Sequence, residues 1–388
     1  MRDESRFRSV AAEGRDSWVQ DVGGIPTPAL VIDVAAMDRN IQQMAKFFAA
    51  GPCRLRPHFK AHKTPEIARR QLVAGSCSGL TCATVSEAEV AVAELADLLA
   101  EVSGDILIAN EPVGPGKCTR VAELTRRVAV TVAVDSVAGL DAVSDAAVRA
   151  EVTVGVLVDL DVGMARCGVS PGGAAVSLGR QVGAAKGVML RGVMGYEGHL
   201  VGLADRAERE ARTRQAMAGL VETADLFRAD GLPCDVVSAG GTGTYDISGR
   251  VEGVTEIQAG SYVLMDGDYG RLDIPFEQAF WVMGTVVSRP EPMRCVTDCG
   301  HKSMTKDHGY PAARDVVGAA VVALNDEHAT ISVPPNCGLT VGDRVYFQPS
   351  HTDPTINLHD VFYALDGNRV VGVWPIAARG YREHRVGA

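Results

Sequence analysis

The chain has 388 residues, 46% of them hydrophobic, and this length predicts one to three domains with a large core. Its net charge of -10, without any basic cluster, argues against a nucleic-acid partner, and no apolar run is long enough to span a bilayer. Because the first residues lack the apolar segment of a signal peptide and nine scattered cysteines are typical of reduced thiols, we expect a cytoplasmic protein.

Hydrophobic patterning predicts alternating strands and helices over the first two thirds of the chain. Residues 1–25 are polar and irregular, and we expect a lead-in that packs on the β domain described below. A strand at 28–33 and a helix at 35–49 follow, and helices are also predicted at 86–100 and 205–229. Eight further strands are predicted at 54–59, 78–82, 105–109, 128–134, 152–160, 188–195, 235–239 and 255–258. This alternation favours an α/β fold, a (β/α)8 barrel over residues 26–270, and a doubly wound sheet is the alternative.

The pattern changes near residue 271, where short strands punctuated by turn residues begin. These strands are predicted at 281–287, 316–324, 328–333, 343–348, 361–365 and 370–374. The sequence therefore predicts a mostly antiparallel β domain over residues 271–388.

The segment from Arg54 to Ile67 is the first with a chemical signal. If its first half is extended, Arg56, His58 and Lys60 share one face, at the end of a strand where catalytic groups of such folds collect. We expect Lys60 to be a buried amine whose pKa burial lowers, so that a neutral fraction exists. A solvated surface lysine is the alternative, because lysines are mostly exposed.

Two later strand ends also carry polar groups. The turn 159–168 contains two acids, a glycine and Arg166, and it could equally be a structural turn with a surface ion pair. His199 follows the strand 188–195 and could move a proton, since its pKa is ordinarily near neutrality. A structural histidine is the alternative reading of His199.

Glycine-rich loops follow the last two predicted strands of the barrel. The first, 238–244, reads Ser-Ala-Gly-Gly-Thr-Gly-Thr, and the second, 258–262, reads Gln-Ala-Gly-Ser-Tyr. Glycine lets backbone N–H groups approach an anion, and hydroxyl groups add donors. Phosphate sites recur after strands seven and eight of such barrels, so the two loops could hold one phosphate.

The segment 348–357 contains His351 and Asp353. Two side chains at i and i+2 share one face of an extended segment, so both could reach one metal ion. Without further context this pair is a very weak motif for a metal site.

Several of these stretches resemble one known family. The segment 57–63, Pro-His-Phe-Lys-Ala-His-Lys, resembles the cofactor-binding lysine segment of the D-threonine aldolase and D-serine dehydratase family, which shares the alanine racemase fold. The turn 159–168 and the segment 348–357 also resemble that family, and the likeness extends from about residue 27 to about residue 374. It implies pyridoxal 5'-phosphate bound through Lys60, with these cofactor-binding candidates: Lys60, His58, Arg166, His199, Ser238, Gly241, Thr242, Gln258, Gly260, Ser261 and Tyr262.

The resemblance also implies roles for single residues. Lys60, His199 and Arg166 would be the catalytic residues, with Arg166 beside the phenolic oxygen of the cofactor. Gln258 stands where alanine racemases carry an arginine that faces the pyridine nitrogen. A neutral partner there leaves that nitrogen unprotonated and the cofactor a weaker electron sink, so that a metal ion would help the chemistry.

The resemblance makes His351 and Asp353 candidate metal ligands. Family dehydratases tend to have a cysteine at the second position and to bind zinc, whereas the aldolases tend to have aspartate and to use manganese or magnesium. Asp353 therefore favours Mn²⁺ or Mg²⁺, and Zn²⁺ remains open, because carboxylate oxygen suits harder ions. A homodimer is also implied.

The expected function is a lyase, a D-threonine aldolase that cleaves D-β-hydroxy-α-amino acids to glycine and an aldehyde. The alternatives are a dehydratase acting on D-serine or 3-hydroxy-D-aspartate, and an aldolase for 3-hydroxy-D-aspartate. A racemase is expected less, because the metal pair would have no task there. A cofactor carrier is expected least, because such carriers lack a β domain.

Overall fold

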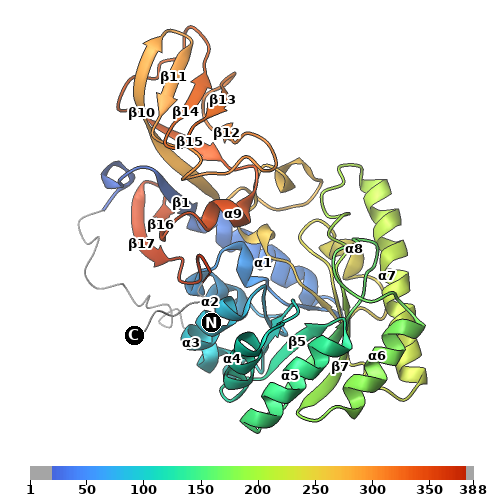
Figure 1. Ribbon diagram of the computed structural model, residues 1–388. Helices are drawn as coiled ribbons and strands as arrows, with labels where there is room; N and C mark the ends of the chain where they lie inside the picture. The colour runs from blue at the N-terminus through green and yellow to red at the C-terminus, as the bar shows by residue number, and fades with distance from the viewer. Residues whose placement is uncertain (1–19, 382–388) are drawn as a thin grey trace.

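The computed structural model describes residues 20–381, so most of the expected lead-in lies outside the described residues. The described chain forms two sheets, one of eight parallel strands and one of nine strands, mostly antiparallel (Figure 1). The predicted α/β class, a (β/α)8 barrel followed by a mostly antiparallel β domain, is confirmed. None of the described helices is long and apolar enough to cross a membrane.

All eight predicted barrel strands are present, in the spatial order β2-β9-β8-β7-β6-β5-β4-β3. Irregular pairing of Leu55 with Cys77 and of His58 with Thr81 closes the ring between β2 and β3. β2 is short, and the next residue, Pro57, has no N–H to donate, although its carbonyl accepts from the Thr81 N–H at 2.9 Å. The barrel strands are β2 (Arg54–Leu55), β3 (Gly79–Cys82), β4 (Asp105–Ile108), β5 (Val130–Val134), β6 (Val154–Asp159), β7 (Val188–Gly195), β8 (Val236–Ala239) and β9 (Glu256–Ile257).

The helices that connect these strands cover the outside of the barrel (Figure 1). Side-chain caps fix where several of them begin: Asp33 accepts from the Ala36 N–H, and Thr84 accepts from the Glu87 N–H. The helices are α1 (Val34–Ala49), α2 (Pro65–Ala74), α3 (Val85–Glu101), α4 (Pro115–Thr125), α5 (Val137–Ala150), α6 (Gly173–Ala184), α7 (Arg206–Ala229) and α8 (Tyr245–Ser248). Short 3-10 turns are η2 (Val22–Gly24), η3 (Phe59–Ala61), η4 (Ser261–Val263) and η5 (Tyr269–Arg271).

The interior of the barrel contains a buried ionic network near the N-terminal ends of its strands. Arg56 is 4% exposed and bonds Glu256 at 2.7 Å and Asp105 at 2.5 Å. Burial alone would raise the pKa of Glu256, but the charge of Arg56 outweighs it and the pKa is lowered. Arg56 and Glu256 therefore form a charged pair inside the barrel, away from the mouth where the strands end.

Arg56→Ala is expected to lower the free energy of unfolding by about 3–5 kcal/mol, because it leaves the buried carboxylate of Glu256 without its cation. Urea unfolding of the full chain measures this. The matched control is Arg39→Ala, which removes an exposed ion pair with Glu277 and should change stability little. Equal effects of the two substitutions would show that the buried network does not stabilise the barrel.

The second sheet is organised around β10 (Phe280–Glu291), which pairs with β1, β11 and β15. β1 (Ala29–Asp33) pairs with β10 and β16, so it lies in this sheet, although the boundary predicted at residue 26 puts it with the barrel. The lead-in residues that the structure describes lie against the same sheet, where Val370 N–H donates to the Gln20 carbonyl. The other members are β11 (Arg294–Thr297), β12 (Ala312–Ala313), β13 (Ala320–Leu324), β14 (Ala329–Ser332), β15 (Arg344–Gln348), β16 (Val361–Asp366) and β17 (Arg369–Pro375).

Candidate active site

A cavity of about 270 Å³ opens at the C-terminal ends of the barrel strands. The structure brings most of the predicted residues to it: His58, Lys60, Arg166, Gly241, Thr242, Gln258, Gly260 and Ser261 line its wall. Among the described residues, the wall also contains polar side chains for which no role was predicted from the sequence: Asn110, Glu111, Asp159, Cys167, Tyr196 and Tyr269. Three predicted residues, His199, Ser238 and Tyr262, are not part of the lining.

Lys60 lies at the junction of the barrel and the β domain. It belongs to the turn η3 rather than to an extended strand, so the expected alternation ends before it. Its Nζ is 3.1 Å from Asp353 Oδ2, and its side chain is 42% exposed. The charge of Asp353 raises the pKa of Lys60 above its ordinary value and outweighs the opposing effect of burial. Burial does lower the pKa of Lys60, as expected, but the net shift is upward, so the expectation of a lowered pKa was wrong for the chain as described.

A buried carboxylate shapes the first glycine-rich loop. Glu197 is fully buried and accepts hydrogen bonds from the Gly240 N–H at 3.1 Å, from Thr244 Oγ1 at 2.7 Å and from Ser248 Oγ at 2.5 Å. Gly240 has a φ of +78°, which favours glycine. These bonds hold the loop at the end of β8 in one conformation.

The second glycine-rich loop packs tightly on the lysine segment. A Cβ added at Gly260 would lie 2.8 Å from the His58 carbonyl oxygen, so only glycine fits there without a shift. Within the described residues, the N–H groups of Thr242 and Gly260 have no hydrogen-bond partner. Both residues line the cavity, so the two loops can offer donors to an anion there.

Ser238 and Tyr262, two of the predicted cofactor-binding residues, do not line the cavity but contact residues that do. Ser238 Oγ accepts from Gln258 Nε2 at 2.8 Å and so orients an amide that lines the cavity. The Tyr262 N–H donates to Thr242 Oγ1 at 3.0 Å, which joins the two glycine-rich loops. The hydroxyl of Tyr262 is buried against Gln71 at 2.8 Å, away from the cavity.

The turn after β6 brings Arg166 to the cavity. Asp161 Oδ1 accepts from the N–H groups of Gly163 and Ala165, both at 2.9 Å, and these bonds build the turn. The Arg166 guanidinium lies over the ring of Tyr196, 5.6 Å from its centroid. His199 is exposed and lies against Gly163, outside the cavity wall.

Two acids, Glu111 and Asp159, also line the cavity wall. Burial and the neighbouring Glu111 raise the pKa of Asp159 to about 8, so its carboxyl is mostly protonated at neutral pH. Asp159 ends β6, and Tyr196 directly follows β7. Their positions at strand ends could have identified both residues from the sequence.

The segment that carries His351 and Asp353 is not extended, so the geometry predicted for this pair was wrong. Residues Thr352–Ile356 form the short helix α9, which packs against η3. Asp266, in the loop after β9, accepts from the Thr352 N–H at 2.9 Å and from its hydroxyl at 2.8 Å. Asp266 thereby anchors the start of α9 to the barrel. The Oδ1 atom of Asp353 is buried and has no hydrogen-bond partner within the described residues.

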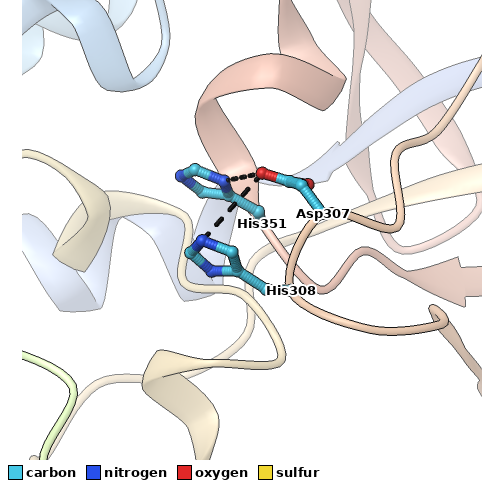
Figure 2. Close-up of side chains that lie close together, drawn as sticks. All are labelled: Asp307, His308 and His351. Carbon is cyan, nitrogen blue, oxygen red and sulfur yellow. Dashed lines mark hydrogen bonds and ion pairs between the residues drawn. The ribbon is translucent and has the colours of Figure 1, made fainter.

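His351 lies in a cluster that the sequence reading missed. Its Nδ1 is 2.5 Å from Asp307 Oδ2, and its ring stacks on that of His308, with centroids 4.1 Å apart (Figure 2). Asp307 and His308 are adjacent in the sequence but lie in a loop between β11 and β12, more than 40 positions before His351. An Asp-His pair in a loop has no periodic signal, so only the fold identifies this cluster.

Comparison with known proteins identifies both halves of the chain. Residues 32–267 match the family model "Alanine racemase, N-terminal domain", and residues 279–365 match "Putative serine dehydratase domain". The chain is 39% identical to D-threonine aldolase of Arthrobacter sp over 92% of this chain and 93% of that protein. It is 29% identical to D-threo-3-hydroxyaspartate dehydratase of Delftia sp. over 90% of this chain and 97% of that protein.

A solved structure also matches nearly the whole chain. The crystal structure of D-threonine aldolase from Filomicrobium marinum superimposes with a TM-score of 0.87 at 37% identity, over 93% of this chain and 97% of that chain. The two proteins thus share both the barrel and the β domain. The chain therefore belongs to the D-threonine aldolase and D-serine dehydratase family of alanine racemase-like proteins, and it is a lyase.

Proposed function

We propose that this chain is a D-threonine aldolase that uses pyridoxal 5'-phosphate and a divalent metal ion, Mn²⁺ or Mg²⁺, to cleave D-β-hydroxy-α-amino acids to glycine and an aldehyde. The observation that carries the proposal is the meeting of Lys60 Nζ and Asp353 Oδ2 at 3.1 Å. This contact brings the proposed cofactor-binding amine and the proposed carboxylate ligand together at one place. The 39% identity to a D-threonine aldolase supports the same activity.

The residues present fit the cofactor. Lys60 supplies an amine at the cavity, and the loops at Thr242 and Gly260 supply free N–H groups for a phosphate. Arg166 would supply a cation for the phenolic oxygen, and Gln258, which Ser238 orients, would face the ring nitrogen. When bound, pyridoxal phosphate supplies an electron sink for the pair of electrons that bond cleavage leaves on Cα.

The residues present also fit a hard divalent ion. Asp353 Oδ1 is a buried acceptor without a donor among the described residues, and His351 adds an imidazole two positions away. Carboxylate and imidazole ligands suit Mn²⁺, and carboxylate suits Mg²⁺. Such an ion supplies a positive charge that lowers the pKa of a substrate hydroxyl.

Proton transfers fall to groups near the same position. The amine of Lys60 stands at the cavity wall and would be placed to return a proton to Cα. His199 was expected as a residue that could move a proton, but it is exposed and outside the cavity lining. Tyr196 lines the cavity instead and is the better placed group for that step.

The distribution of charge favours a substrate without a second carboxylate. Among the described residues, the lysine and arginine side chains in the cavity wall are Lys60 and Arg166, and the proposal assigns both of them to the cofactor. Nearby His308 already pairs with Asp268. A 3-hydroxy-D-aspartate substrate would therefore find no spare cation, whereas the methyl group of D-threonine needs none. β-Elimination is the second candidate, because the relatives include a dehydratase.

Product analysis tests the proposal. The full-length chain with pyridoxal phosphate, Mn²⁺ and D-threonine is expected to yield glycine and acetaldehyde in equal amounts, and L-threonine is the control that should yield neither. Assays for 2-oxobutyrate and ammonia run in the same samples. Formation of 2-oxobutyrate with ammonia would replace the aldolase proposal by elimination.

A further inference from the structure

We propose that Asp307 is a positioning residue for the metal site, which holds the imidazole of His351 by its Nδ1–H group so that Nε2 is the ligating atom. The proposal rests on the proposed function, since it takes His351 as a metal ligand. It adds a residue that lies 44 positions away from His351 in the sequence and outside the motif that suggested the metal.

The contacts of Asp307 support a fixed carboxylate. One oxygen, Oδ2, lies 2.5 Å from His351 Nδ1, and the other, Oδ1, accepts from Thr305 Oγ1 at 2.7 Å. Thr305 is in turn joined to α9, because its N–H donates to Thr355 Oγ1 at 3.3 Å. The loop that carries Asp307 is therefore tied to the helix that carries Asp353.

The contact decides the tautomer of His351. A carboxylate can only accept, so Nδ1 must carry the proton and Nε2 must carry the lone pair when the imidazole is neutral. Nε2 has no hydrogen-bond partner among the described residues, and Figure 2 shows it on the edge of the ring that faces away from Asp307. This arrangement leaves one nitrogen of His351 open to an ion.

The stacked rings argue against a three-ligand site made of Asp307, His308 and His351. Although atoms of all three lie close together, the imidazole planes are inclined by only 9°. The lone pairs of ring nitrogens lie in the ring planes, so two stacked rings cannot both direct one at a single ion about 2.1 Å away. The stack instead restricts rotation of the His351 ring.

His308, which stacks on His351, is itself held by a carboxylate. Its Nδ1 pairs with Asp268, which comes from the barrel loop after β9. The two imidazoles thus form a stack that is held by one carboxylate from each domain. Such carboxylate partners of a ligating histidine fix its orientation and raise its basicity, and their loss weakens metal binding by about 10–100-fold.

Calorimetric titration of the cofactor-loaded, metal-free protein with MnCl₂ tests the proposal without relying on turnover. Asp307→Ala is expected to weaken Mn²⁺ affinity about 10–100-fold. Asp307→Asn keeps an acceptor for Nδ1–H and should weaken it less. His308→Ala should cost far less than His351→Ala, which removes the ligand itself. The control Asp366→Ala removes an exposed carboxylate that is 67% accessible, elsewhere in the β domain, and should leave the affinity unchanged.

A second readout follows the tautomer directly. In metal-free protein labelled with ¹⁵N-histidine, His351 should show a protonated Nδ1 at alkaline pH, and Asp307→Asn should retain that pattern while Asp307→Ala loses it. Unchanged affinity in Asp307→Ala would overturn the proposal. Loss of binding in Asp307→Asn and His308→Ala as complete as in His351→Ala would also overturn it, because both residues would then be ligands. If the unaltered protein binds no Mn²⁺, the proposed metal dependence fails instead.

Discussion

Replacement of Lys60 by alanine is expected to abolish covalent binding of pyridoxal phosphate and to lower turnover of D-threonine by roughly 10⁴-fold or more. The reason is that this amine stands in the cavity wall beside both glycine-rich loops and Asp353. The visible absorbance of the lysine-bound cofactor measures attachment. Borohydride reduction followed by peptide mass spectrometry identifies the lysine that carries it.

Lys63 provides the matched control, because it lies on the same segment but turns elsewhere. Its Nζ is 3.2 Å from Glu87 Oε1, and the side chain is only 15% exposed. Lys63→Ala should therefore keep the absorbance and the turnover. Persistence of the absorbance in Lys60→Ala, together with its loss in Lys63→Ala, would move the attachment site to Lys63.

The fold could be predicted from the sequence because its signals are local and repeated. Buried parallel strands such as β5 and β6 are nearly continuous runs of Val, Ala and Leu, and the helices between them repeat apolar residues at helical spacing. The membership of β1 could not be predicted in this way. Its residues pattern like a first barrel strand, and only its pairing with β10 and β16 places it in the other sheet.

The site could be predicted only in part, and the reason differs between residues. Residues at strand ends, such as Arg166 and Gly241, follow from position along the chain. Asp353 was assigned with His351 to an extended segment, whereas residues Thr352–Ile356 form α9, because Pro354 is tolerated in the first turn of a helix. Asp307 pairs with His351 across a long separation in the sequence, which no local pattern can report.

His199 and Tyr196 also show that position along the chain predicts the site only in part, because Tyr196 lines the cavity and His199 does not. Both follow β7, and the catalytic role was predicted for the histidine because an imidazole ordinarily titrates near neutrality. The chain bends after Tyr196, where the next residue, Glu197, is buried under the glycine-rich loop. That burial directs Tyr196 to the cavity and leaves His199 at the surface.

Asp353→Ala is expected to remove metal-dependent turnover while the cofactor stays bound. Loss of the carboxylate ligand should lower kcat by roughly 10²–10⁴-fold, which corresponds to about 3–5 kcal/mol of transition-state stabilisation. Attachment of the cofactor should not suffer, because Asp353 raises the pKa of Lys60 and its removal leaves more of that amine neutral at a given pH. Turnover with and without Mn²⁺ and the visible absorbance measure the two effects separately.

Asp360→Ala is the control for this substitution, because Asp360 lies just before β16 with its side chain 82% exposed, paired only with Arg379 among the described residues. It should leave both readouts unchanged. Asp353→Asn keeps an oxygen ligand without the charge and should fall between alanine and the unaltered chain in Mn²⁺ affinity. Unchanged activity of Asp353→Ala after chelation would remove the metal from the mechanism. Loss of the cofactor absorbance would instead assign Asp353 to holding Lys60 in place, because the pair at 3.1 Å would then serve the amine rather than an ion.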